Sequence, residues 1–226
     1  MQQRSGFAGE KSDRCGLGHF LALANAAEIK NRKLDLFWVA LSIGFAFLTW
    51  KYALREAYWP IWLFILLHLQ CALIFAIRQP ARRSSKRPLE ILLTILSLNY
   101  FLAFEPVPID AAALAPLGAL VVAAGALLTL VSVHHLGRSF AVLPSLREIR
   151  TDGMYGWIRH PIYFSYLVTA LGILLRHLTI YNLAVALVGV VLILCRIHFE
   201  ERLLAEDDAY RGYMNAVRYR LIPGVY

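Results

Sequence analysis

Charged residues are scarce in this chain of 226 residues: Asp, Glu, Lys and Arg make up 17% of the sequence, and hydrophobic residues make up 59%. About a quarter of the residues of an ordinary water-soluble domain are charged. Cysteine is also rare, and Cys15, Cys71 and Cys195 form no CxxC pair, which argues against a disulfide framework or a thiolate zinc site. Low charge and long apolar runs also exclude a disordered chain. The composition indicates an integral membrane protein.

Common nucleotide and metal motifs are absent as well. Gly16-Leu17-Gly18 is too short to be a GxGxxG motif, and we expect no strand in the chain that could precede such a motif. The run His198-Phe199-Glu200-Glu201 is not the HExxH of zinc proteases. His134 and His135 are adjacent, so they point to different faces of a helix and form a poor metal pair. We therefore expect an all-α protein with neither a Rossmann-type nucleotide site nor a metal site.

Apolar runs predict about six helices. A run of about 20 residues crosses the hydrocarbon layer, which is roughly 30 Å thick. Four runs suit transmembrane helices: Leu34–Leu54, Tyr58–Ile77, Leu89–Phe104 and Ala111–Leu136. Pro161–Leu175 and Leu178–Ile197 follow, and the short break between them predicts a tight helical hairpin. The first arm rises only about 22 Å, so it begins before Pro161, crosses at a thinned place, or only dips into the membrane.

The distribution of positive charge predicts the orientation. Twenty of the 23 lysines and arginines lie in four segments that this topology places on one face: residues 1–33, 78–87, 138–159 and 196–220. Only Lys51, Arg55 and Arg176 fall on the other face. Because positively charged loops stay inside, we expect both termini to be cytoplasmic. The net charge of +8 is thus explained without nucleic acid, which is not an expected partner.

Two segments outside the spans favour the membrane surface. Leu17–Ala27 is apolar but is followed at once by Glu28 to Lys33 and a full span, which favours a surface helix over a cleaved signal or a disordered start. The loop Gln79–Pro88 has four basic residues, which predicts a solvated connection that lies near anionic headgroups.

The first cluster of polar residues runs from Gly137 to Tyr163, a loop that is long for a mere connection. It ends in Arg159-His160-Pro161-Ile162-Tyr163. Pro161 suits the first turn of a helix, whose free N–H groups and partial positive charge would lie beside Arg159 and His160. The pattern predicts either an anion pocket at the membrane surface or a basic anchor for lipid headgroups.

The second cluster begins inside the last apolar run. Arg196 and Glu200 are four residues apart, so they share one face of a helix. His198 and Glu201 accompany them where the helix leaves the apolar layer. Ionisable groups at that depth usually line a cavity. The alternative is an ordinary ion pair at a helix end.

The order of these motifs resembles the isoprenylcysteine carboxyl methyltransferase family. The resemblance rests on Gly153-x-Tyr155, Arg159-His160-Pro161-x-Tyr163, an apolar hairpin, Glu200-Glu201-x-x-Leu204 and Tyr210-x-x-Tyr213. It covers roughly Gly137–Tyr226, and the wider group includes membrane phospholipid N-methyltransferases. Two positions depart from the family pattern: Ser165 stands where glycine is common, and Glu206-Asp207-Asp208-Ala209 stands where a Phe-Gly pair is common.

The resemblance implies an S-adenosylmethionine site built from the loop, the mouth of the hairpin and the tail. Arg196 would hold the substrate carboxylate as the catalytic residue, and Arg159 would join it in binding the substrate. The residues expected to line the cofactor are Arg147, Glu148, Ile149, Arg150, Tyr155, His160, Pro161, Ile162, Tyr163 and Glu200. No metal is implied.

The expected function is methyl transfer from S-adenosylmethionine to a lipophilic acceptor, foremost the carboxylate of an isoprenylcysteine-like or other prenylated substrate. A carboxylate is already ionised at neutral pH, so the enzyme mainly positions and desolvates. The alternatives are an NADPH-dependent membrane reductase of the sterol reductase type, a phospholipid N-methyltransferase and a non-enzymatic lipid anchor. We expect an interfacial segment 1–33, four transmembrane helices in 34–136 and a catalytic region 137–226. A bacterial inner membrane, with the site facing the cytoplasm, suits this pattern.

Overall fold

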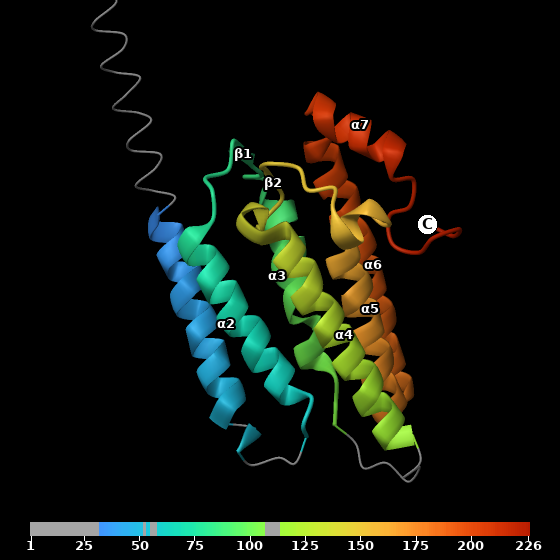
Figure 1. Cartoon of the computed structure of the whole chain (residues 1–226). Coiled ribbons are helices and arrows are strands. Elements are labelled where there is room, and N and C mark those ends of the chain that lie inside the picture. Colours follow the sequence, from blue (N-terminus) through green and yellow to red (C-terminus); the bar gives the residue numbers. More distant parts are fainter. Residues whose placement is uncertain (1–31, 52, 55–57, 107–113) are drawn as a thin grey trace, which may run out of the picture.

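The computed structural model describes residues 32–51, 53–54, 58–106 and 114–226. Within these residues, apolar helices pack side by side and run alternately in opposite directions (Figure 1). Their bounds are Arg32–Lys51, α2 Ile61–Ile77, α3 Pro88–Asn99, α4 Leu114–Leu136, α5 Pro161–Arg176 and α6 Ile180–Leu204. Arg32–Lys51, α4 with its short extension to Ser139, and α6 are long and apolar enough to cross a membrane. The prediction of an all-α polytopic membrane protein is confirmed.

Prolines set where several helices begin. Pro60 is the N-cap of α2, which therefore starts later than the predicted Tyr58. Pro88 and Pro161 occupy the first turns of α3 and α5, where the missing N–H would have no partner anyway. The predicted run Leu89–Phe104 is not one α-helix, because α3 ends at Asn99 and continues as the 3-10 turn η1, Tyr100–Ala103. The expected surface helix in 1–33 falls almost entirely outside the described residues.

The predicted hairpin is present, with three residues between α5 and α6. Asn182, fully buried at the start of α6, donates its amide to the carbonyl oxygens of Glu105 (2.9 Å) and His177 (2.7 Å), which fixes the turn. The first arm starts at Pro161 and no earlier, and it has 16 residues. The second arm continues to Leu204, beyond the predicted end at Ile197, because the polar residues there are good helix formers and no glycine or proline interrupts them.

A two-stranded antiparallel sheet joins two loops that are distant in the sequence. β1 (Arg83–Ser84) pairs with β2 (Ser145–Leu146), and the two serine hydroxyls lie 2.8 Å apart. The expectation that the chain has no strand was wrong. Strands of two residues leave no alternating apolar pattern in the sequence, so only the structure reveals them.

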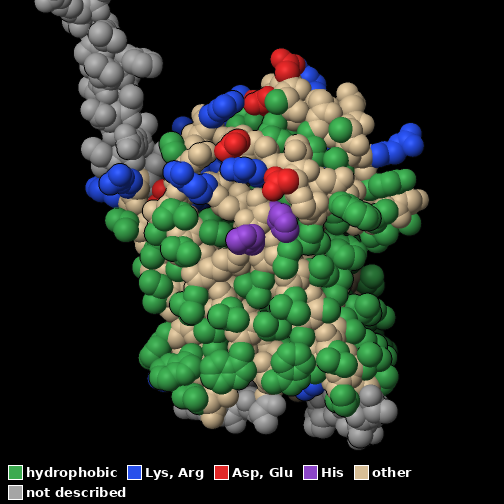
Figure 2. All heavy atoms as spheres, viewed as in Figure 1, with side chains coloured by type: hydrophobic (Ala, Val, Ile, Leu, Met, Phe, Trp, Pro, Cys, Tyr) green, Lys and Arg blue, Asp and Glu red, His purple; other side chains and the backbone are tan. Residues whose placement is uncertain are grey.

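Positive charge gathers at one end of the molecule, which we call the basic end. It carries β1, β2 and α7 (Asp208–Ala216), and hydrophobic side chains cover the helices below it (Figures 1 and 2). Hydrogen bonds connect the loops there, including Gln79 N–H to the Arg138 carbonyl (3.1 Å) and Arg83 to Glu206. The basic segments within the described residues gather at this end (Figure 2), and the membrane topology itself stays a prediction. Which face is cytoplasmic stays a prediction.

Helices α4 and α5 pack with almost no space between their backbones. A Cβ placed on Gly172 would lie 2.5 Å from the backbone nitrogen of Val122, and one on Gly125 would lie 2.3 Å from Thr169 Oγ1. Buried hydroxyls join the helices as well, with Thr129 Oγ1 2.7 Å from Ser165 Oγ. Small residues that allow close approach are a common basis of helix association in membranes. The α4–α5 pair therefore holds α5 in a fixed position against α4.

We expect Gly172→Ala to destabilise the protein by about 1–3 kcal/mol, since the added methyl group meets backbone that cannot move aside. The melting temperature of the detergent-purified protein should fall by several degrees. Gly44→Ala is the matched control, because nothing lies within 4 Å of a Cβ at that helical position. Equal melting temperatures for the two variants would contradict the close packing.

Candidate functional site

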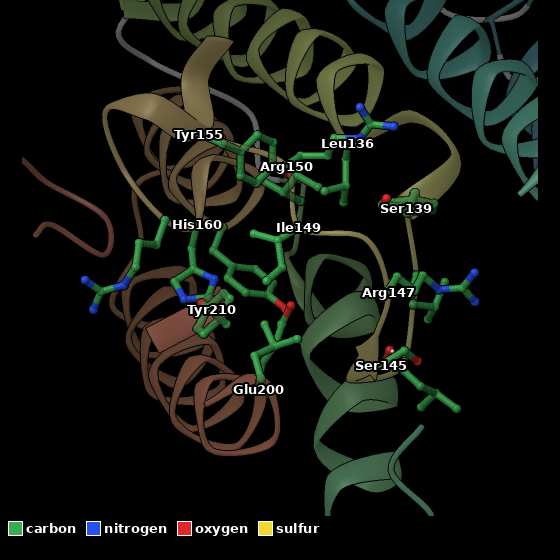
Figure 3. Close-up of a pocket in the computed structure, with 18 of the residues that line it drawn as sticks. Leu136, Ser139, Ser145, Arg147, Ile149, Arg150, Tyr155, His160, Glu200 and Tyr210 are labelled. Atoms are coloured by element: carbon green, nitrogen blue, oxygen red, sulfur yellow. Dashed lines mark hydrogen bonds between the residues drawn. The ribbon is translucent and has the colours of Figure 1, made fainter. Parts of the chain in front are cut away.

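A cavity of about 130 Å³ opens at the basic end where three segments meet (Figure 3). The segments are the loop after α4, the start of α5 and the end of α6 with α7. Nine of the ten predicted cofactor residues line it, and Pro161 does not. Arg159 and Arg196 also line it. The two polar clusters of the sequence therefore belong to one cavity.

A buried carboxylate, Glu201 at the end of α6, joins the start of α5 to the C-terminal tail. Arg159 Nε donates to it at 2.7 Å, His160 Nε2 lies 3.1 Å from the same oxygen, and Arg220 Nε reaches the other oxygen at 2.8 Å. Backbone bonds reinforce this corner, because the N–H groups of Arg159 and His160 donate to carbonyls of the tail at 2.9 Å. A buried carboxylate is tolerated only when it is paired in this way. We call Glu201, Arg159, His160 and Arg220 the clamp.

The guanidinium group of Arg159 uses its hydrogen bonds within the protein. Besides Glu201, it donates to the carbonyl oxygens of Val217 (2.7 Å) and Arg218 (2.8 Å), and its side chain is 8% exposed. These contacts give it a structural task in joining α5 to the tail. Its predicted contact with a substrate stays a prediction.

Glu200, next to the clamp, faces the cavity. The Tyr163 hydroxyl donates to its carboxylate, and the Tyr163 ring stacks on His160 with centroids 5.5 Å apart. Successive residues of a helix are turned by about 100°, so Glu201 can serve the clamp while Glu200 points into the cavity.

Arg196 lies one helical turn deeper than Glu200 and makes no ion pair with it within the described residues. Its guanidinium donates to Ser97 Oγ at 3.1 Å and to the Val142 carbonyl, and it lies over the Tyr163 ring at 5.1 Å. The residue is 6% exposed, and its Nε has no acceptor among the described residues. The geometry therefore disfavours the Arg196–Glu200 ion pair that the sequence left open. It leaves Arg196 Nε as a buried donor at the deep end of the cavity.

The loop side of the cavity also carries buried donors without partners in the described chain. These are Ser139 Oγ, Arg150 Nε, and Nε and Nη1 of Arg147. Burial, together with the charge of Arg78, lowers the pKa of Arg147 to about 10. Leaving such groups unpaired is costly. A bound anion would supply acceptors, although Figure 3 shows Arg147 projecting away from His160 and Glu200.

Aromatic side chains form the wall between these donors and α7. The Tyr213 hydroxyl donates to the Tyr155 carbonyl at 2.7 Å, and the rings of Tyr210 and Tyr213 meet edge to face at 5.5 Å. Burial raises the pKa of Tyr155 far above its ordinary value, so its phenol stays neutral. Such a wall suits a flat ring better than a charged group.

The sequence reasoning missed part of the cavity wall. The missed residues come from the loop after α4, from neighbouring helices and from α7, namely Leu98, Leu136, Ser139, Phe140, Ala141, Val142, Leu143, Ser145, Tyr166, Leu204, Tyr210 and Tyr213. Most are apolar and carry no chemical signature. The Tyr210-x-x-Tyr213 spacing was the one available signal, since it places both rings on one face of a short helix.

Fold and cavity together define a polytopic helical membrane protein with an amphiphilic pocket at its basic end. Residues 114–209 match the family model described as phospholipid methyltransferase. This range contains α4, α5, α6 and most of the clamp, and its similarity is to membrane methyltransferases. The match does not single out the isoprenylcysteine branch. No curated protein matches the chain.

Neutralising Glu201 should destabilise the protein, whereas neutralising the neighbouring Glu200 should not. Glu201→Gln leaves Arg159 and Arg220 without their counter-charge and should cost about 3 kcal/mol, a fall of several degrees in melting temperature. Glu200→Gln keeps an acceptor for the Tyr163 hydroxyl and should leave the melting temperature of the ligand-free protein nearly unchanged. A larger fall in melting temperature for Glu200→Gln than for Glu201→Gln would show that Glu201 is not the central residue of the clamp.

Proposed function

We propose that the protein is an integral membrane methyltransferase that moves a methyl group from S-adenosylmethionine to a lipophilic acceptor. The observation that carries the proposal is the single cavity that combines Glu200, Arg196 and unpaired loop donors where the apolar helices end. The match of residues 114–209 to phospholipid methyltransferases supports the same class.

The residues present fit this cofactor. Its carboxylate would find unpaired donors at Ser139 Oγ and Arg150 Nε, and its ammonium or ribose hydroxyls would find an acceptor in Glu200. The Tyr155 wall suits the adenine ring. Arg147 remains a predicted contact whose guanidinium would have to turn toward the ligand.

When bound, the cofactor supplies an electrophilic methyl group on a sulfonium. The chain's own residues orient and desolvate the partners. Arg196 is held by Ser97 and the Val142 carbonyl, so its free Nε can fix a carboxylate acceptor without a large rearrangement. An ionised carboxylate needs no base, which agrees with a site that is rich in arginine. The tyrosine rings beside Arg196 exclude water.

Two acceptor classes follow from two different observations. The buried, partly unpaired Arg196 favours a lipophilic carboxylate, such as that of a prenylated cysteine, because a guanidinium repels a protonated amine. The family match favours a phospholipid amine as the second candidate. We propose the carboxylate as the main acceptor. It would arrive between the helices, and the cofactor would enter from the basic end, which we assign to the cytoplasm.

Cofactor binding is testable without knowledge of the acceptor. Near 100 times its dissociation constant, S-adenosylmethionine should add about 2.7 kcal/mol of stability and raise the melting temperature of the detergent-purified protein by several degrees. Glu200→Gln should lose most of this rise. Glu105→Gln, an exposed site in the turn after α3 and outside the cavity, is the matched control and should keep it. A rise with NADPH instead would favour the reductase.

Acceptor chemistry is testable with a tritiated methyl group. We expect transfer from the labelled cofactor to a prenylated cysteine to yield an ester that releases volatile methanol in alkali. Arg196→Lys keeps the charge but loses the planar fork, so transfer should fall at least about tenfold while the cofactor still raises the melting temperature. Arg176→Lys, at the far end of α5, should stay active. Alkali-stable label on a phospholipid amine would contradict the carboxylate assignment.

A further inference from the structure

A second hollow lies at the basic end, and it shares no residue with the cavity described above. Its volume is about 730 Å³, and it runs from the segment around β1 to the end of α6. We call it the basic groove. Its lining residues are Ala81, Arg82, Arg83, Ser84, Ser85, Lys86, Arg87, Pro88, Glu90, Phe199, Arg202, Leu203 and Glu206.

Internal ion pairs use only some of the positive charge in the groove. Arg83 pairs with Glu206, and Arg87 lies 3.4 Å from Glu90, so both acidic residues of the lining are taken. Lys86 and Arg202 are exposed and have no acidic partner among the described residues. Lys86 comes from the segment after β1 and Arg202 from α6, so two separate elements bring unpaired cations to one hollow, and this favours the binding of an anion.

The lining of the groove also includes apolar residues. Phe199 and Leu203 come from the last two turns of α6, just past its long apolar stretch, and Pro88 begins α3. The groove therefore spans the level at which the helices leave the hydrocarbon layer. Negative lipid headgroups concentrate at this level. A free phosphate would use the cations but would leave the apolar lining residues uncovered.

We propose that the basic groove binds the headgroup of an acidic phospholipid in the leaflet at the basic end. Lys86 and Arg202 pair with the phosphate and any further negative charge, and the glycerol region packs on Phe199 and Leu203. A zwitterionic lipid carries its own counter-charge, so it binds more weakly. The site does not depend on the methyltransferase assignment, since none of its residues lines the cavity that contains Glu200.

The test is native mass spectrometry of the full-length protein in detergent, titrated with phosphatidylglycerol or phosphatidylcholine. Each basic residue near anionic lipid contributes about 1 kcal/mol, which is roughly fivefold in affinity. We expect Lys86→Gln and Arg202→Gln each to weaken phosphatidylglycerol binding about fivefold and to leave phosphatidylcholine binding unchanged. Raising the salt concentration should weaken the binding of phosphatidylglycerol but not that of phosphatidylcholine.

Matched controls have the same change in charge at the same end of the molecule. Lys33→Gln and Arg218→Gln remove exposed basic residues outside the groove, and both should bind phosphatidylglycerol like the unmodified protein. Equal weakening by groove and control variants would overturn the proposal in favour of diffuse attraction. Loss of bound phosphatidylglycerol on adding millimolar inorganic phosphate at constant ionic strength would overturn it in favour of a small-anion site.

Discussion

The pocket depends on one buried carboxylate and the three cationic or polar side chains that surround it. Glu201 ties the start of α5, through Arg159 and His160, to the end of α6, and Arg220 brings in the tail. The desolvation penalty of a carboxylate is repaid only when such partners are complete. The three segments therefore have to assemble as a unit. Because Glu201 performs this task, the adjacent Glu200 is free to face a ligand.

The same arrangement separates two kinds of polar group within one cavity. Glu200 and the loop donors lie toward the basic end, and Arg196 lies one turn deeper, between Ser97 and Val142. Packing and hydrogen bonds hold these groups in place, which suits a reaction that depends on positioning. The proposed methyl transfer is such a reaction, because it requires alignment and exclusion of water rather than removal of a proton.

Much of the fold was predictable because membrane helices leave a strong signal. The apolar runs, Pro161 at the start of α5 and the short break after Arg176 all lie close to where they were expected. The juxtaposition of Arg159–Tyr163 with Arg196–Glu201 came from motif order and family resemblance. Contacts that depend on tertiary structure were not predictable: the β1–β2 pair is too short to show periodicity, and backbone loops contribute much of the cavity wall. The role of Glu201 also required coordinates, since the sequence analysis singled out Glu200 as a cofactor residue and assigned no role to Glu201.

The unequal arms of the hairpin have a consequence for where the pocket lies. α5 has 16 residues and α6 has 25, and the two share a tight turn at the opposite end. At 1.5 Å per residue, α6 overshoots its neighbour by about 14 Å. Because of this offset, the start of α5, where His160 and Tyr163 line the cavity, lies deeper in the bundle than the end of α6. The proposed reaction needs a site at such a depth, because a water-soluble reagent and a lipophilic one would have to meet where the aqueous phase borders the hydrocarbon layer.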